Sequence, residues 1–261
     1  MALDQPLAAP PPSGIGFPGS WLVRTGDVDA DSRLRFDGIA RYLEDLGWDN
    51  LQATFFVKTD PIWIVRRTVI DVIEPITWPD KVGLRRWCSG LSTRWTNMRV
   101  QIAGAKGGLI ETEGFLINIS ETTGMPTRIS DEGLAALMTQ TEEHRLRWRS
   151  WLSEPAPPES KRDVPFHLRA TDIDMFNHLN NAAYWQAIES LMLDHPTLLS
   201  VPHRAVIEYA APVFAREEVT VRSRFDAGDP SGPALRVWFI VDGAVRTTAR
   251  VSALPQQKSV Q

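Results

Sequence analysis

The chain has 261 residues, 43% of them hydrophobic, which is enough for one large domain or for two domains that each bury a core. Its formal net charge of −4 provides no basic field for nucleic acid or for an anionic lipid surface. The single cysteine, Cys88, excludes an intramolecular disulfide and is typical of a reducing cytoplasm, where we expect the protein to act. No apolar run approaches the roughly 20 residues that a membrane span needs.

The N-terminal part of the sequence predicts a tail, a strand and a helix. Residues 1–14 are rich in alanine and proline and lack the basic and apolar regions of a secretory signal, so we expect a disordered tail. Residues 21–25 predict a short strand. Apolar residues then recur at three- and four-residue spacing over 36–46, which predicts a helix with Ser32 as its N-cap and Gly47 as its C-cap.

The remainder of the first half predicts an antiparallel sheet. β-Branched and aromatic residues predict strands over 62–73, 82–88, 93–102 and 109–119. A loop and a short helix are expected over 124–137, and the charged stretch 142–151 predicts another helix. The proline cluster at 155–158 indicates a linker between two domains.

The second half repeats this plan. A strand over 166–170 precedes a helix over 181–193, and further strands are expected over 206–209, 219–225, 235–241 and 245–253. Asp27 and Asp29 match Asp172 and Asp174 at an offset of 145, and residues 69–71 match 206–208 at an offset of 137. We interpret this as a duplication. The expected divisions are a tail (1–14), a first repeat (15–140), a linker (141–162), a second repeat (163–255) and a tail (256–261).

A dense polar motif stands where the second repeat passes from strand to helix. The run Asp-Ile-Asp-Met-Phe-Asn-His-Leu-Asn-Asn at 172–181, with Tyr184 after it, resembles the signature of hotdog-fold thioesterases. The duplicated layout resembles the acyl-acyl-carrier-protein thioesterases of plants and bacteria. The first half resembles that family's N-terminal half in the same order, at 63–67, 78–80, Trp95, Arg99, 117–118 and 128–129. The resemblance implies an α+β protein with two tandem hotdog folds, each a long helix wrapped by an antiparallel sheet, forming a pseudo-dimer within one chain.

The same resemblance implies a function and a site. The protein would hydrolyse fatty acyl-acyl-carrier-protein thioesters in fatty acid biosynthesis, without a cofactor. Asp174 would be the catalytic carboxylate, acting as general base or as nucleophile, with assistance from His178. Backbone amides in the first turn of the helix would face the thioester oxygen. Four further residues would support the site or orient the substrate: Asn177, Asn180, Asn181 and Glu208. For Asn180 and Asn181, capping of the helix is the favoured role.

Three departures from the plant enzymes bear on the mechanism. Phe176 stands where those enzymes carry an asparagine, and Pro212 and Val213 stand where they carry an acidic residue and a cysteine. A cysteine-based mechanism is therefore not available there, and we interpret Cys88 as a core residue of a strand. In the first repeat Arg33 replaces the histidine, so we expect that half to have lost catalysis and to serve as scaffold or acyl pocket.

Other functions remain open from the sequence: an acyl-CoA thioesterase, a hotdog hydratase or dehydratase, and a non-catalytic acyl-thioester-binding module. The expected partner is an acyl carrier protein or CoA thioester, not nucleic acid, and the protein would be a monomeric pseudo-dimer or a homodimer. An acidic carrier needs a basic docking surface. The candidates are Arg145, Arg147 and Arg149, or else Arg85 and Arg86.

Overall fold

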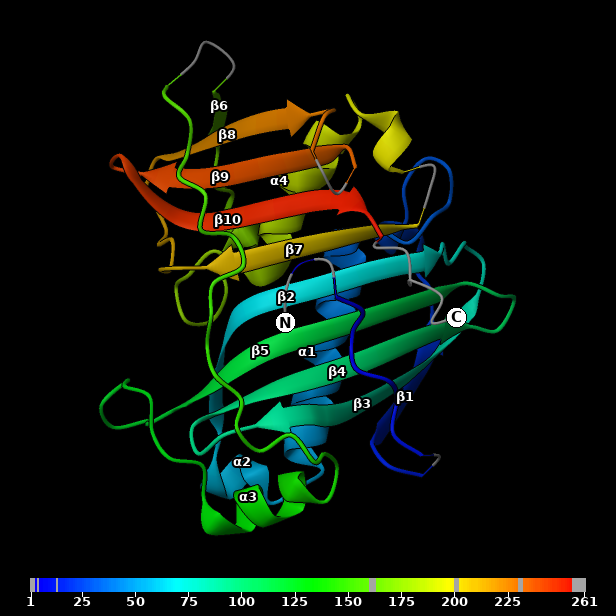
Figure 1. Cartoon of the computed structure of the whole chain (residues 1–261), viewed down its shortest axis with the longest axis vertical. Helices are drawn as coiled ribbons and strands as arrows, with labels where there is room; N and C mark the ends of the chain where they lie inside the picture. Colours follow the sequence, from blue (N-terminus) through cyan, green and yellow to red (C-terminus); the bar gives the residue numbers. More distant parts are fainter. Residues whose placement is uncertain are drawn as a thin grey trace.

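The computed structural model describes residues 3, 5–12, 14–159, 163–199, 202–229 and 232–254, so the expected tail at 256–261 lies outside the described residues. Its main feature is one ten-stranded antiparallel sheet in the order β1-β3-β4-β5-β2-β7-β10-β9-β8-β6. Two long helices, α1 and α4, lie against one face of this sheet (Figure 1). No helix in the described ranges is long and apolar enough to cross a membrane.

The elements follow the duplicated plan. The first half contains β1 (Phe17–Leu22), α1 (Phe36–Gln52), α2 (Phe56–Thr59), β2 (Ile62–Glu74), β3 (Lys81–Leu91), β4 (Trp95–Gly104), β5 (Leu109–Ile119) and α3 (Asp131–Met138). The second half contains β6 (Val164–Phe166), α4 (Asn181–Met192), β7 (His203–Tyr209), β8 (Val219–Asp226), β9 (Ala234–Val241) and β10 (Ala244–Ala253). The strand order β1-β3-β4-β5-β2 of the first half matches β6-β8-β9-β10-β7 of the second.

The two halves join through β2 and β7. These strands pair antiparallel, and Val69 lies opposite Val206, its own counterpart in the repeat. A pseudo-two-fold axis therefore passes between these two residues. The structure confirms the expected pair of α+β units, each with a long helix across its own sheet, arranged as a pseudo-dimer.

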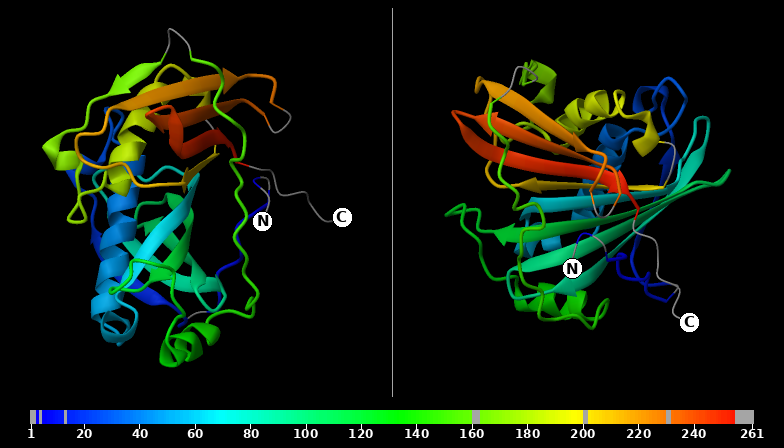
Figure 2. Two further views of the ribbon diagram at one scale, coloured as in Figure 1. Left: turned by 90° about the vertical axis from the view of Figure 1, so that its left-hand side faces the viewer. Right: turned by 45° about the horizontal axis from the view of Figure 1, so that its top comes forward.

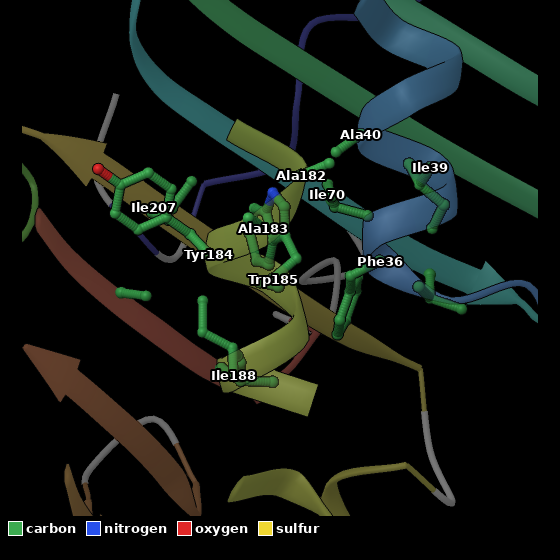
Figure 3. Packing of buried hydrophobic residues seen from close by; sticks show 14 of the residues in the cluster. Phe36, Ile39, Ala40, Ile70, Ala182, Ala183, Tyr184, Trp185, Ile188 and Ile207 are labelled. Carbon is green, nitrogen blue, oxygen red and sulfur yellow. The ribbon is translucent and has the colours of Figure 1, made fainter. Parts of the chain in front are cut away.

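The hydrophobic core lies between the sheet and the two helices. The rings of Phe36 on α1 and Trp185 on α4 have centroids 5.3 Å apart. Figure 3 shows α1 and α4 running in opposite directions, with Ala40 beside Ala182 where they meet. Small side chains at this crossing let the helices approach closely. Each helix start consequently lies beside the middle of the other helix.

Two expected caps of α1 are wrong. The helix begins at Phe36 with Arg35 in the N-cap position, and Arg35 makes no side-chain capping bond. Ser32 instead lies in the preceding loop with φ 63°. Gly47 is inside the helix, which continues to Gln52. A glycine in a helix interior costs about 1 kcal/mol relative to alanine, which the burial of the neighbouring Leu46 offsets.

The helix expected over 142–151 is also wrong. This segment is extended and runs across the face of the sheet opposite α1 and α4 (Figure 2). The Trp95 indole N–H donates to the Leu146 carbonyl at 2.9 Å, and the Leu91 N–H donates to the Glu143 carbonyl at 2.8 Å. Alternate residues face away from the sheet and are exposed, namely Arg145, Arg147 and Arg149. This period of two is typical of an extended chain, and the charged composition obscured it.

The described part of the N-terminal segment lies on the same outer face. The Leu3 and Gln5 carbonyls accept hydrogen bonds from Arg204 Nη1 at 2.7 and 2.6 Å. Arg204 in turn forms a buried, bidentate ion pair with Asp71, with both bonds at 2.7 Å, which connects β7 to β2. The outer face of the central strands is therefore covered by chain from both the tail and the linker.

Candidate active site

The site is built on a loop whose conformation occurs twice in the chain, once in each repeat. In the second copy Asp174 Oδ1 accepts hydrogen bonds from the backbone N–H groups of Phe176 at 2.9 Å and His178 at 3.0 Å. In the first copy Asp29 Oδ1 accepts from the N–H groups of Asp31 at 2.9 Å and Arg33 at 2.8 Å. Asn177 and Ser32 take the same left-handed conformation, with φ 62° and 63°. The repeat therefore extends to the backbone of this turn.

Asp174 has one oxygen fixed and one free. Oδ1 holds the turn, whereas Oδ2 has no hydrogen-bond partner within the described ranges. The side chain is half-buried at the start of α4. A carboxylate held in this way has a fixed orientation and an oxygen available to water or to a substrate.

His178 follows Asp174 by four residues, and its imidazole packs on Phe214. The two ring centroids are 4.9 Å apart and the rings meet edge to face, at 78°. Neither imidazole nitrogen has a hydrogen-bond partner in the part of the chain that the structure describes. Met175, Phe176 and Phe214 surround the loop with exposed apolar surface. The histidine is therefore positioned by packing, and its ring nitrogens are open to a ligand.

The start of α4 presents one open backbone amide. Asn180 is the N-cap: its Oδ1 accepts from the Ala182 N–H at 2.7 Å, and its own N–H donates to the Asp172 carbonyl at 2.8 Å. These two amides are thus satisfied. The Asn181 N–H has no partner among the described residues. It is a hydrogen-bond donor at the positive end of the helix dipole.

A residue that the sequence reasoning missed, Glu44 of α1, reaches the same point. Asn180 Nδ2 donates to Glu44 Oε2 at 3.2 Å. Burial raises the pKa of Glu44, the negative charges of Asp45 and Asp174 raise it further, and hydrogen bonds from Asn180 and Asn181 oppose the increase. A signal existed in the sequence: an offset of 145 from Glu44 leads to another glutamate, Glu189.

The first copy of the site is closed by two side chains, Arg33 of the same loop and Glu189 of α4. The second oxygen of Asp29 accepts from Arg33 Nε at 3.0 Å, so the carboxylate is neutralised by the residue that replaces the histidine. The Phe36 N–H, which is the counterpart of the Asn181 N–H, donates to Glu189 Oε1 at 2.6 Å. This half has neither a free carboxylate oxygen nor an open first amide.

Two of the residues expected to orient the substrate make structural contacts, Asn177 inside the loop and Glu208 on the outer face of the sheet. Asn177 is exposed and its N–H donates to the Asp174 carbonyl at 3.0 Å, so it shapes the turn. The structure does not bring Glu208 to Asp174. Glu208 accepts from Arg67 Nη1 at 3.1 Å and from the Trp151 N–H at 2.9 Å, on the outer face of the sheet. Neighbouring residues of a strand face opposite ways, and Tyr209 occupies the inner face against Tyr184.

The cysteine lies away from this site, as expected. Cys88 is fully buried in β3, and burial raises the pKa of its thiol to about 12. A thiol in that environment is not a nucleophile.

Comparisons with known proteins identify the family. Residues 14–137 match the acyl-ACP thioesterase N-terminal domain and residues 156–245 match the C-terminal domain. The uncharacterised protein Rv2001 of Mycobacterium tuberculosis is 41% identical over 252 residues, which cover 97% of this chain and 98% of that protein. Oleoyl-acyl carrier protein thioesterase 1 of Arabidopsis thaliana is 23% identical over 195 residues, which cover 66% of this chain and 53% of that protein.

Solved structures share the fold across at least 90% of the chain. An acyl-ACP thioesterase from Bacteroides thetaiotaomicron superposes with a TM-score of 0.74 at 16% identity, covering 90% of this chain and 96% of that one. The 12:0-ACP thioesterase of Umbellularia californica superposes with a TM-score of 0.72 at 14% identity, covering 93% and 98%. The chain therefore belongs to the acyl-ACP thioesterase family and is a thioester hydrolase built from two tandem hotdog folds.

Proposed function

We propose that the protein hydrolyses fatty acyl-acyl-carrier-protein thioesters to free fatty acid and carrier protein, at a site formed by Asp174, His178 and the first amide of α4. The observation that carries the proposal is the contrast between the two loops. Only the second loop combines a free carboxylate oxygen, an unpartnered imidazole and an open helix amide within the described ranges. Family membership supports the acyl carrier protein as the thiol carrier.

Each group has a role that follows from its chemistry. Asp174 Oδ2 accepts a proton from the attacking water or attacks the carbonyl carbon itself. The Asn181 N–H donates to the carbonyl oxygen as negative charge develops there. His178 donates a proton to the sulfur as the carbon–sulfur bond breaks. The products are a fatty acid and the free carrier thiol.

The two roles of Asp174 give different isotope patterns. In a single turnover in ¹⁸O-labelled water, a general base delivers one labelled oxygen to the fatty acid. A nucleophile first forms a mixed anhydride, and water that attacks the enzyme carboxyl carbon of this anhydride leaves an unlabelled enzyme oxygen in the first product. An unlabelled fatty acid in mass spectrometry therefore identifies the nucleophilic route, provided that enzyme exceeds substrate; a labelled acid arises by the general-base route or when water attacks the acyl carbon of the anhydride.

The carrier is tested by comparing matched thioesters. Free thiol release is followed with acyl-acyl-carrier-protein and acyl-CoA substrates of several chain lengths, with a reaction without enzyme as the blank. A higher kcat/KM for the carrier protein thioester supports the proposal. Faster turnover of the CoA ester makes the protein an acyl-CoA thioesterase. An enoyl thioester is tested in parallel. If no thiol is released above the blank and the enoyl thioester loses its absorbance, hydrolysis is overturned in favour of hydration.

The two groups of arginines considered for carrier docking differ in availability. Arg86 Nη1 donates to Asn50 Oδ1 at 2.6 Å, and burial lowers the pKa of Arg86 to about 10. Arg145 and Arg147 are exposed on the linker. Charge reversal of these two linker residues should raise the KM for the carrier protein at low salt if they form the docking surface.

A further inference from the structure

Two glutamates occupy equivalent positions on the crossing helices. Glu44 of α1 and Glu189 of α4 are separated by 145 positions, as are Asp29 and Asp174. The helices α1 and α4 run in opposite directions (Figure 3). Each glutamate consequently lies beside the start of the other helix, where it accepts a hydrogen bond. The fold thus directs a carboxyl group at the first turn of each helix.

The two carboxyl groups make different contacts. Glu189 Oε1 accepts directly from the Phe36 N–H, at 2.6 Å, and thereby occupies the first amide of α1. Glu44 Oε2 accepts from the side chain of Asn180, at 3.2 Å, and the side-chain amide of Asn181 also interacts with it. The first amide of α4 remains open among the described residues.

The sequence difference between the halves explains these contacts. The positions of Asn180 and Asn181 are occupied in the first half by Arg35 and Phe36. An arginine and a phenylalanine place no side-chain amide between the incoming carboxyl group and the helix start, and Arg35 is directed instead to Asp37, at 2.9 Å. Asparagine side chains supply the two donors that intercept Glu44.

We infer that Asn180 and Asn181 are positioning residues for the hydrolysis, because their side-chain amides hold the Glu44 carboxyl group off the Asn181 N–H. Glu189, the equivalent of Glu44, is not restrained in this way and occupies the first amide of α1. The inference rests on the proposed function. It assigns the asparagine pair a second task besides capping: the pair keeps the oxyanion donor available. It also gives the inactivity of the first half a second cause besides the loss of the histidine.

The experiment separates capping from this tethering. In N180S/N181A the introduced serine still accepts from the Ala182 N–H as a good N-cap, but it has no amide to donate to Glu44, so the tether is removed. We expect kcat for the acyl thioester to fall about 100-fold, the effect of losing one oxyanion donor, with KM nearly unchanged. Removing the glutamate from this variant, in E44A/N180S/N181A, should restore kcat at least tenfold. The matched control is E189A/N180S/N181A, which should not recover.

Recovery specific to E44A supports the inference, because a glutamate that only stabilised α4 would reduce activity further when removed. An unchanged kcat in N180S/N181A, or equal effects of E44A and E189A, overturns it. Should the double asparagine variant unfold, N180S alone, with and without E44A, gives the same contrast. Failure of the proposed function gives a different result, since the wild-type protein would then release no more thiol than a reaction without enzyme.

Discussion

The Asp174 carboxylate accepts a hydrogen bond from the backbone N–H of His178 at 3.0 Å, while the His178 ring packs on Phe214 and makes no bond to that carboxylate in the described structure. The backbone contact sets the turn, and the side chains are left to the substrate. The His178 side chain can therefore be changed without removing the contact that shapes the loop, and asparagine at position 174 would keep an acceptor oxygen for it.

Replacement of His178 by alanine should therefore impair catalysis and leave the loop intact. Alanine retains the backbone N–H that Asp174 Oδ1 accepts. We expect kcat to fall by about 10²–10⁴, the usual contribution of a general acid, with little change in KM. R33A, at the equivalent position of the first half, is the control and should retain full activity. Steady-state kinetics decide, and an H178A variant with more than about a tenth of wild-type kcat contradicts the assigned role.

Glu208 should matter for stability and not for turnover. Its carboxylate binds the buried Arg67 and the linker at Ser150 and Trp151. E208A leaves the Arg67 guanidinium without its partner, which typically costs about 3–5 kcal/mol in the free energy of unfolding. R128A removes the exposed Arg128–Asp131 pair and should cost less than about 1 kcal/mol. Urea denaturation measures both, and a lower kcat with unchanged stability would return Glu208 to the active site.

Cys88 should be inert in the folded protein. Burial raises the pKa of its thiol to about 12, so almost no thiolate is present near neutral pH. Native protein should therefore retain its activity and its single thiol during incubation with a maleimide, and unfolded protein should react at one site. Mass spectrometry counts the adducts. Rapid labelling of native protein with loss of activity would contradict a cysteine-free mechanism.

Glu189 should make stability depend on pH. Burial raises its pKa from 4.5 to about 8; hydrogen bonds from the Phe36 and Asp37 amides and the charge of Arg35 oppose this shift, and the charge of Asp37 adds to it. Between pH 4.5 and about pH 8, Glu189 is protonated in the folded state and ionised in the unfolded state. The free energy of unfolding therefore falls as pH rises through this range. The loss is at most about 5 kcal/mol. E189Q keeps the acceptor oxygen and should lose less stability in urea titrations at pH 5 and pH 9. A steeper loss in E189Q contradicts this pKa.

Local patterns in the sequence predicted most of the architecture. The strand over 109–119 has the expected bounds, and α4 begins at Asn181 as expected and ends one residue early, at Met192. Capping residues and periodicity are local signals. The offset of 145 located both copies of the loop. Ser32 looked like a cap, but the first amide of α1 is bound by Glu189, a residue 153 positions away. The residues around the start of a helix do not indicate a contact with a residue so distant in the sequence.

The placement of Glu208 failed for a related reason. Its neighbour Tyr209 packs in the core, and alternation along β7 therefore directs Glu208 to the opposite face. The linker that covers this face was expected to be helical, so nothing in the sequence marked that surface as buried. The chemistry that we propose for Asp174 and His178, by contrast, depends on one short loop whose residues are contiguous.

The most direct test of the proposed site compares D174N with D29N. Asparagine keeps an acceptor oxygen for the two backbone amides in either turn, so both variants should fold and only the charged oxygen is lost. Thiol release from an acyl-acyl-carrier-protein substrate is measured for both, with unfolding curves as a check on structure. D174N should lose at least about 100-fold in kcat/KM, whereas D29N should match the wild type. Equal activity of the two variants would contradict the assignment of catalysis to the second loop.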